Sequence, residues 1–192
     1  MKQVKKMKIR NFIIISLLFV GIVLFGVVQF VIIPHNNAER EKYILQQQEP
    51  TTHDLKSILK YKNRYMGNAS NIINLFHNLP LSKVGMKFQL FPEKLTLEVS
   101  YQDTVLNIGE EKVEVSLIYN SVAAFALVDN LEAIDYNFPD ESYKVKREDV
   151  EKAYSYFNDI LKENIWENTV QGRLKDKKQV DDLVDKVLIK QK

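Results

Sequence analysis

FIIISLLFVGIVLFGVVQFVII, residues 12–33, is a run of 22 residues without a charged side chain. At about 1.5 Å per residue, an α-helix of this length measures roughly 33 Å, which is enough to cross the hydrocarbon core of a bilayer. A lone segment in lipid must satisfy its own backbone hydrogen bonds, so a helix is the expected form. The run predicts a single uncleaved transmembrane helix, because the apolar region of a signal peptide is usually only about 7–15 residues long.

The charges around this run predict which way the chain crosses the membrane. Residues 1–11 hold five basic residues and no acidic one, whereas residues 39–42 carry two of each sign. Positively charged flanks are retained on the cytoplasmic side of a membrane. We therefore expect the lipid bilayer of the cell membrane as a partner, with residues 1–11 in the cytoplasm and residues 34–192 outside it.

The composition excludes several classes of protein. Of 192 residues, 45% are hydrophobic and 27% are charged, and there is no Cys to form a disulfide, ligate a metal or act as a nucleophile. After residue 11, 22 basic residues stand against 25 acidic residues. A weakly acidic body argues against nucleic acid as a partner, because binding to phosphates needs concentrated positive charge.

The distribution of polar and apolar residues divides the chain into five parts. We predict a cytoplasmic tail at 1–11, a transmembrane helix at 12–33, a polar spacer at 34–52, an extracytoplasmic domain at 53–165 and a charged C-terminal helical tail at 166–192. Within this tail, an apolar stripe predicts a last helix that is only loosely attached to the domain. The stripe consists of Val180, Leu183, Val184 and Val187.

The first half of the predicted domain combines two short helices with a β-hairpin. Thr52 or Asp54 caps the first helix, and Asn68 caps a second helix that runs to about residue 78. Apolar residues alternate in 86–90 and again in 95–101, on either side of a turn. Each strand then has one apolar face, which requires a covering layer.

The second half gives a mixture of clear and open predictions. Residues 110–119 fit either a strand or the start of a helix, whereas the alanine-rich residues 120–128 favour a helix. Residues 131–138 alternate like a strand, and residues 143–145 form a short extended piece. The fold class is therefore α+β, a small sheet packed by helices. A long amphipathic helix is expected from Arg147, with Val150, Tyr154, Phe157 and Leu161 in line.

Two motifs in the domain resemble those of a known family. Residues 61–68, YKNRYMGN, are followed by Leu79-Pro80-Leu81 and resemble a YK..Y.G(N/D)…LP motif; residues 120–131, NSVAAFALVDNL, resemble an NA..LFALIDNV motif. Both are typical of the domain-of-unknown-function family DUF4825. That family is found in Gram-positive bacteria, commonly behind an N-terminal membrane anchor, and some members accompany membrane-bound metallopeptidases of the antibiotic-sensor type.

This resemblance covers about residues 54–160 and implies that residues 120–130 are helical. Ser121 and Ala123 depart from the family, which prefers Ala and a larger aliphatic residue there, and this difference concerns packing only. The family has no assigned activity, so the resemblance implies no catalytic residue.

The sequence holds no recognisable pattern of catalytic or metal-binding residues. The histidines, His35, His53 and His77, form no HExxH motif, and no GxSxG or phosphate-binding glycine loop is present. His53 is expected near a helix start, and His77 at the edge of an apolar stripe. The acidic residues around 135–141 fit a strand end and a turn better than a calcium loop. We therefore expect no enzyme activity, no metal and no cofactor.

Tyr61 and Tyr65 are the only candidate ligand-binding residues. They lie four residues apart on or just after a predicted helix. Their rings could stack on a sugar or a peptide, although paired aromatic residues at helical spacing more often pack into a core.

These features favour a membrane-tethered extracytoplasmic module of the cell envelope, with a binding or a sensory and accessory role and an envelope or membrane protein as partner. A structural or assembly component of an envelope complex is the alternative. A hydrolase with an unrecognised site is a third hypothesis, supported only by the usual supply of polar residues.

Overall fold

The computed structural model describes the backbone of residues 2–191, and the side chains from residue 12 to residue 191 except those of residues 13 and 15. The chain forms two compact units, Met1–Ile44 and Leu45–Lys192. The fold is α+β, as the sequence predicts, with an apolar N-terminal helix and a five-stranded sheet packed by helices.

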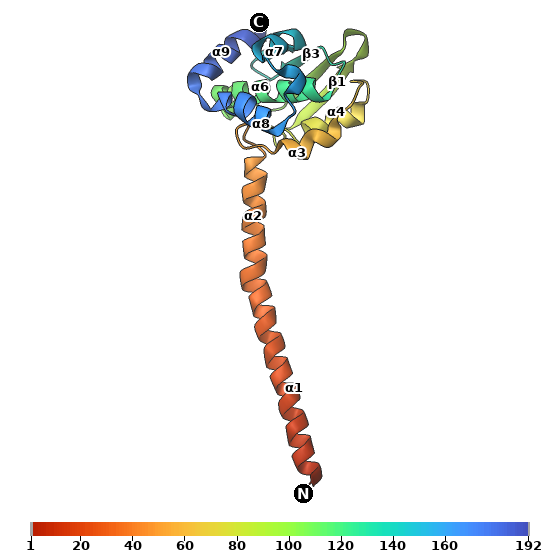
Figure 1. The fold of residues 1–192 in the computed structure, drawn as a ribbon, viewed down its shortest axis with the longest axis vertical. Helices are drawn as coiled ribbons and strands as arrows, with labels where there is room; N and C mark the ends of the chain where they lie inside the picture. The colour runs from red at the N-terminus through yellow and green to blue at the C-terminus, as the bar shows by residue number, and fades with distance from the viewer. Residues whose placement is uncertain (1, 192) are drawn as a thin grey trace. The chain divides into compact units, whose positions relative to one another are not determined.

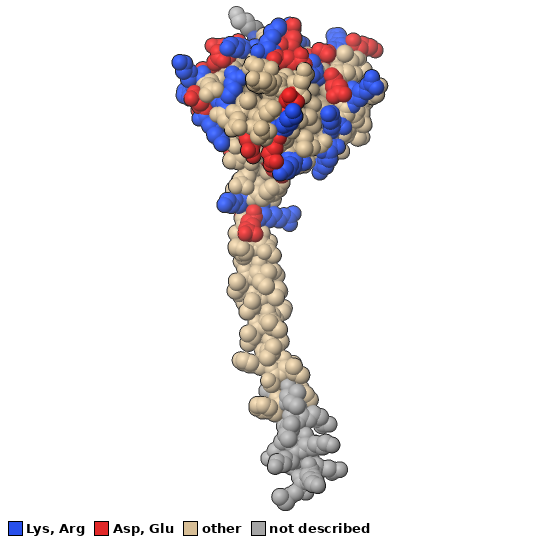
Figure 2. All heavy atoms as spheres, in the orientation of Figure 1, with Lys and Arg blue, Asp and Glu red and all other residues tan. Residues whose placement is uncertain are grey.

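The N-terminal unit is helical. It contains α1 (Lys2–Val27), the π-helical turn η1 (Val28–Ile32) and most of α2 (Ile33–Gln46). The stretch Ser16–Gln46 is long and apolar enough to cross a membrane, and none of its most apolar part is buried. Figure 2 shows charged side chains at one level of this described helix, which agrees with the charged residues at 39–42.

The π-helical turn has a local cause in Pro34. Proline lacks a backbone N–H, and its ring collides with the carbonyl of the fourth residue before it in a regular α-helix. The turn just before Pro34 is wider, because the N–H of Ile33 donates to the carbonyl of Val28, five residues back. The helix therefore continues beyond the apolar run into α2.

The second unit contains a mixed sheet of order β1-β2-β3-β4-β5. Strands β2 and β3 are parallel, and the other neighbours are antiparallel. The predicted hairpin is confirmed, with Met86 opposite Tyr101 and Leu90 opposite Leu97. The strands are β1 (Met86–Phe91), β2 (Thr96–Tyr101), β3 (Ala133–Asn137), β4 (Ser142–Lys146) and β5 (Ile189–Gln191).

The helix α6 (Glu110–Leu127) resolves the open question at residues 110–119, which are helical. A parallel strand pair needs a long crossover, and α6 lies in the connection from β2 to β3. Figure 1 shows α6 in the middle of the domain. Twelve of its 18 residues are buried. Burial on nearly all sides removes the one-sided apolar stripe, which is why the sequence pattern was ambiguous.

The two faces of the sheet differ. Leu97, Val99, Ile134 and Tyr136 are buried in the same core as the apolar residues of α6. On the opposite face, the residues between and after them in these strands are polar and half-buried, namely Glu98, Ser100, Asp135 and Asn137. One face of the sheet is therefore covered and the other faces solvent, as is common where antiparallel pairs dominate.

Short helices surround this core, and the two predicted caps are confirmed. The side chain of Asp54 accepts a hydrogen bond from the N–H of Lys56 (2.9 Å), and that of Asn68 accepts one from the N–H of Asn71 (3.2 Å). The remaining elements are α3 (Leu55–Ile58), η2 (Leu59–Tyr61), α4 (Ala69–Phe76), η3 (Pro92–Lys94), α5 (Val105–Ile108), α7 (Arg147–Ala153), η4 (Phe157–Asp159), α8 (Glu163–Ile165), η5 (Trp166–Gln171), η6 (Arg173–Lys175) and α9 (Lys177–Val187).

The long helix predicted from Arg147 is wrong, because α7 ends at Ala153. A residue far along the chain completes this end. The guanidinium of Arg173 donates to the carbonyl of Ala153 (2.8 Å) and lies over the ring of Tyr154 (5.0 Å to its centroid). The following Ser155 and Asn158 are poor helix formers, so the chain turns away after seven helical residues.

The expectation of a loosely attached last helix is also wrong. In α9, Val180, Leu183 and Val187 are buried in the core of the domain. Strand β5 then pairs with β4 and completes the sheet. Only every third or fourth residue of α9 faces the core, and most of the others are charged. The sequence of α9 therefore looks more like a solvated helix than a packed one.

Candidate functional site

A polar pocket of about 480 Å³ lies between two segments that are far apart in the sequence. One segment, residues 51–55, follows the end of α2, and the other, residues 163–175, belongs to α8, η5 and η6. The lining residues are Thr51, Thr52, His53, Asp54, Leu55, Glu163, Trp166, Glu167, Asn168, Gln171 and Lys175.

His53 forms the inner wall of this pocket and is 2% exposed. Its Nε2 lies 2.7 Å from the carbonyl oxygen of Asn78, and its Nδ1 lies 2.9 Å from the hydroxyl of Tyr119. A carbonyl only accepts, so the Nε2–H donates and Nδ1 accepts from Tyr119. Burial lowers the pKa of His53, although the carbonyl of Asn78 and the charge of Asp54 act in the opposite direction. The imidazole is therefore held neutral, with both nitrogens engaged.

Gln171 fixes the same loop from the other side. Its buried amide nitrogen donates to the carbonyls of Pro50 (3.1 Å) and His53 (2.8 Å). Trp166 is fully buried beside it and packs edge-on against Tyr119, with ring centroids 5.3 Å apart. These contacts join residues 50–53 to α6 and η5.

The rim of the pocket is charged. The ammonium group of Lys56 lies 2.7 Å from Glu163, and this hydrogen bond raises the pKa of Lys56. Glu163 lines the pocket together with Asp54, Glu167 and Lys175, whereas Lys56 lies outside the lining and reaches it through Glu163. Since the histidine nitrogens are occupied by protein groups, the arrangement suits binding of a polar group more than proton transfer.

The two tyrosines that the sequence singles out have different surroundings in the structure. Tyr61 ends η2 and is half-buried, and its hydroxyl accepts from the amide of Asn78 (2.9 Å). Tyr65 lies beyond the helix and is 59% exposed, with the guanidinium of Arg64 over its ring. Tyr61 therefore contributes to packing, whereas Tyr65 is available at the surface; a ligand role for either stays a prediction.

The two sequence motifs meet in space. The N–H of Asn63 donates to the carbonyl of Leu127 (2.8 Å), and the N–H of Asp129 donates to the carbonyl of Asn63 (3.0 Å). The side chain of Asn130 accepts from the N–H of Met66 (2.6 Å). The motif residues thus hold the start of the domain against the end of α6.

Other polar residues noted in the sequence make contacts with neighbouring groups of the protein. The carboxylate of Asp140 accepts from the N–H groups of Val105 (2.9 Å) and Leu106 (3.1 Å) at the start of α5. His77 is exposed against Phe88, and His35 lies 3.3 Å from Glu39. Within the part of the chain that the structure describes, no group of three or more His, Asp or Glu residues is placed to hold a metal ion.

The hydrogen bonds that join His53 to Tyr119 and Gln171 are not predicted from the sequence. His53 and Tyr119 are 66 residues apart, and Gln171 lies 118 residues from His53. No local spacing can reveal such contacts. The only signal is the position of Tyr119 between apolar residues of α6, which is compatible with burial but names no partner.

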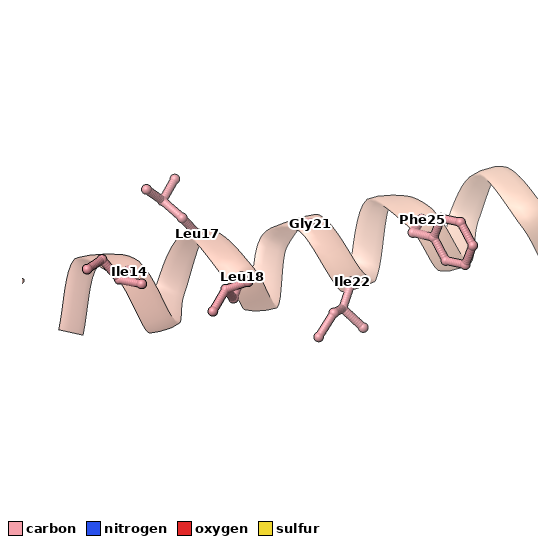
Figure 3. Close-up of a pocket in the computed structure, with 6 residues that line it drawn as sticks. All are labelled: Ile14, Leu17, Leu18, Gly21, Ile22 and Phe25. Atoms are coloured by element: carbon pink, nitrogen blue, oxygen red, sulfur yellow. The ribbon is translucent and has the colours of Figure 1, made fainter. Parts of the chain in front are cut away.

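A second hollow lies on α1 itself. Figure 3 shows Gly21 between larger apolar side chains of the same helix, and a Cβ built at Gly21 would point into open space. The notch therefore exists because one side chain is missing from an apolar surface. Its lining is Ile14, Leu17, Leu18, Gly21, Ile22 and Phe25.

Comparison with known proteins identifies the central part of the second unit. Residues 58–149 match the family model described as "Domain of unknown function (DUF4825)". No curated protein and no solved structure matches the chain. The two sequence motifs lie inside the matched range, whereas the residues that line the polar pocket lie on either side of it.

Proposed function

We propose that this chain, whose residues 58–149 are a DUF4825 domain, is a membrane-tethered extracytoplasmic module that binds a protein of the cell envelope and acts as an accessory or sensor without catalysing a reaction. The observation that carries the proposal is the uncharged run of residues 12–33. In the structure, its described side chains are exposed along the helix. So much exposed apolar surface on one helix is stable in lipid but not in water.

The basic flank at residues 1–11 supports the orientation, because positive charge next to an apolar helix favours the cytoplasmic side. The second unit would then lie outside the cytoplasm. The absence of Cys from the whole sequence is compatible with an oxidising compartment, where a free thiol is a liability.

A binding role is favoured by the chemistry of the domain. His53 is the buried histidine, and its two nitrogens serve the fold by holding Asn78 and Tyr119. Glu163, Glu167 and Lys175 line this pocket and are exposed to solvent, where their side chains are free to form polar contacts with a partner. Such a surface recognises a partner more readily than it performs acid–base chemistry.

The topology is tested by labelling single cysteines in intact cells, which is clean because the natural chain has none. Ser155→Cys places a thiol at an exposed position of the second unit, and Gln3→Cys places one in the N-terminal tail. A membrane-impermeant maleimide should label Ser155→Cys in intact cells, and Gln3→Cys only after permeabilisation. The reverse pattern, or equal labelling of both, would refute the proposal.

A further inference from the structure

The charges of the second unit are strongly segregated along the chain. Residues 55–97 contain seven basic residues and one acidic residue, whereas residues 98–192 contain 13 basic and 20 acidic residues. The first segment folds into α3, η2, α4, β1, the turn η3 and the start of β2. In Figure 2, blue side chains gather over the region where Figure 1 shows α3 and α4.

Most of these basic side chains make no ion pair within the described residues. Lys56 pairs with Glu163, but the other six are exposed and make no ion pair within the described residues. Elsewhere in the unit most exposed basic side chains do have such a pair, for example Lys162 with Asp159 and Lys190 with Glu141. The six basic residues are Lys60, Lys62, Arg64, Lys83, Lys87 and Lys94.

Strand β1 forms a free edge of the sheet among these residues. The N–H of Gln102 donates to the carbonyl of Gly85 (2.8 Å), and in an antiparallel pair such bonded positions alternate. The backbone N–H and C=O groups of Met86, Phe88 and Leu90 therefore point away from β2. They make no hydrogen bond to any part of residues 2–191. We call these groups the β1 edge.

Three of the free lysines flank this edge. Lys87 lies within β1, Lys83 precedes the strand, and Lys94 follows it in η3 with its ammonium over the ring of Phe91. The remaining basic residues lie at 60–64, in a segment that is linked to β1 through the end of α4. Tyr61 bonds to Asn78 at the end of α4, and the neighbouring His77 packs against Phe88 of β1.

The geometry points to the β1 edge as a docking site for an extended, acidic segment of a partner protein, which adds a sixth strand to the sheet. Unpaired main-chain groups supply the hydrogen bonds in this mode of recognition, and side chains beside the edge supply specificity. Here the lysines at 83, 87 and 94 select carboxylates on the incoming strand. Lysine on an edge also opposes pairing of β1 with a second copy of itself.

This inference names the chemistry of the partner in the proposed function, and rests on it for the compartment in which that partner is met. Its test does not depend on topology. The full chain, purified in detergent micelles, is titrated with a fluorescent ten-residue peptide of alternating glutamate and valine. Two comparison peptides carry lysine in place of glutamate, or N-methyl groups on alternate residues, which remove the hydrogen bonds of one strand edge.

We expect the acidic peptide to bind at least ten-fold more tightly than either comparison peptide. Residue-resolved hydrogen exchange should slow at the amides of Met86, Phe88 and Leu90 when it binds. The triple variant Lys83→Gln/Lys87→Gln/Lys94→Gln should weaken binding at least ten-fold. The matched control replaces three exposed lysines that have ion pairs elsewhere, Lys112→Gln/Lys152→Gln/Lys177→Gln, and should change it less than two-fold.

Other outcomes would overturn the inference. Equal binding of the N-methylated peptide, with unchanged exchange at the three amides, would show a surface that attracts polyanions without strand addition. Displacement of the peptide by anionic phospholipid in the micelles, with the same unchanged amides, would assign the basic residues to the membrane. If light scattering detects dimers and the peptide dissociates them into monomers, the edge would be assigned to a second copy of the chain. In each case the labelling test of topology would keep its own result.

Discussion

The apolar run of residues 12–33 and helix α6 have similar stretches of hydrophobic sequence but meet different surroundings. Side chains of the first are exposed along the helix, whereas 12 of the 18 residues of α6 are buried by the domain. The polar residues in each show the difference. In α6, the amide of Asn120 donates to the carbonyl of Pro80 (2.9 Å), and Ser121 bonds to Tyr136 (3.0 Å). Ser16 and Gln29 of the apolar run are exposed.

Side-chain size separates the two helices as well. Ala123 and Ala124 of α6 are small and fully buried. The apolar run uses large residues around its whole circumference and leaves open space at Gly21. A helix that packs in a protein core is thus shaped position by position, while a helix that meets lipid only has to be apolar.

The largest predicted effect is on the apolar run. The double variant Leu18→Arg/Ile22→Arg places two charges near its centre, and each costs about 2.5–3.5 kcal/mol on insertion. We expect the full chain to move from the alkali-resistant membrane fraction to the soluble fraction or to be degraded. Leu18→Phe/Ile22→Phe is the matched control and should stay in the membrane. Membrane retention of the arginine variant would break the comparison with α6.

Truncation of one leucine should lower the free energy of unfolding in α6 but not in the apolar run. Leu117 is fully buried, so Leu117→Ala should lower the free energy of unfolding of the domain by about 2–5 kcal/mol. Leu17 is 66% exposed, and Leu17→Ala should leave the unfolding unchanged. The fluorescence of Trp166, the only tryptophan and fully buried, reports urea unfolding in micelles. Equal losses in the two variants would contradict the assigned surroundings.

The end of α6 offers a sharper test of how this helix is held. The guanidinium of Arg147 donates to the carbonyls of Phe125 (2.9 Å), Val128 (2.7 Å) and Leu131 (2.7 Å). Lysine cannot reach three carbonyls in this fork, so Arg147→Lys should cost about 1–3 kcal/mol of unfolding free energy. Lys152→Arg, at an exposed position, is the control. No loss in the same urea titration would show that these bonds do not hold the helix end.

The smallest predicted effect is a pH dependence from His53, which is bonded to α6 through Tyr119. Burial lowers the pKa of His53 in the folded state, so the unfolded chain binds a proton more readily below its ordinary value of about 6.5. Unfolding free energy should therefore fall as the pH is lowered through that value, by at most about 1.4 kcal/mol per pH unit. Below the folded-state pKa the slope vanishes.

This contribution is isolated by difference, because other groups also titrate. The unfolding free energy of the natural chain minus that of His53→Gln, measured from pH 7.5 to pH 5, should decline on acidification. His77→Gln, which replaces an exposed histidine, is the matched control variant. A difference that is flat, or that rises on acidification, would show that His53 is not held neutral by burial.

The comparison also explains how much of the fold is predictable from sequence. The apolar run and the β-hairpin depend on local patterns, namely unbroken hydrophobicity and alternation over 86–101, and both are found in the structure. Residues 110–119 could not be assigned because a helix buried on several sides loses its period. The end of α7 was missed because it depends on Arg173, 20 residues after Ala153.

The candidate site was less accessible to prediction than the fold. Tyr65 is at the surface, as a binding residue requires, but its exposure could not be derived from its spacing to Tyr61. The pocket depends on contacts between residues 50–55 and 163–175, which only the packed domain brings together. Prediction of the β1 edge requires the strand order as well as the positions of the lysines, since sequence alone does not reveal which strand lies outermost.

The most direct test of the two assigned surroundings is photolabelling from within the lipid phase. A hydrophobic carbene precursor is dissolved in membranes that contain the full chain and activated, and the modified peptides are mapped by mass spectrometry. We predict adducts within residues 12–33 and none within Glu110–Leu127. Adducts on α6, or an unmodified apolar run beside a labelled membrane protein, would contradict the assignment of one helix to lipid and the other to the protein core.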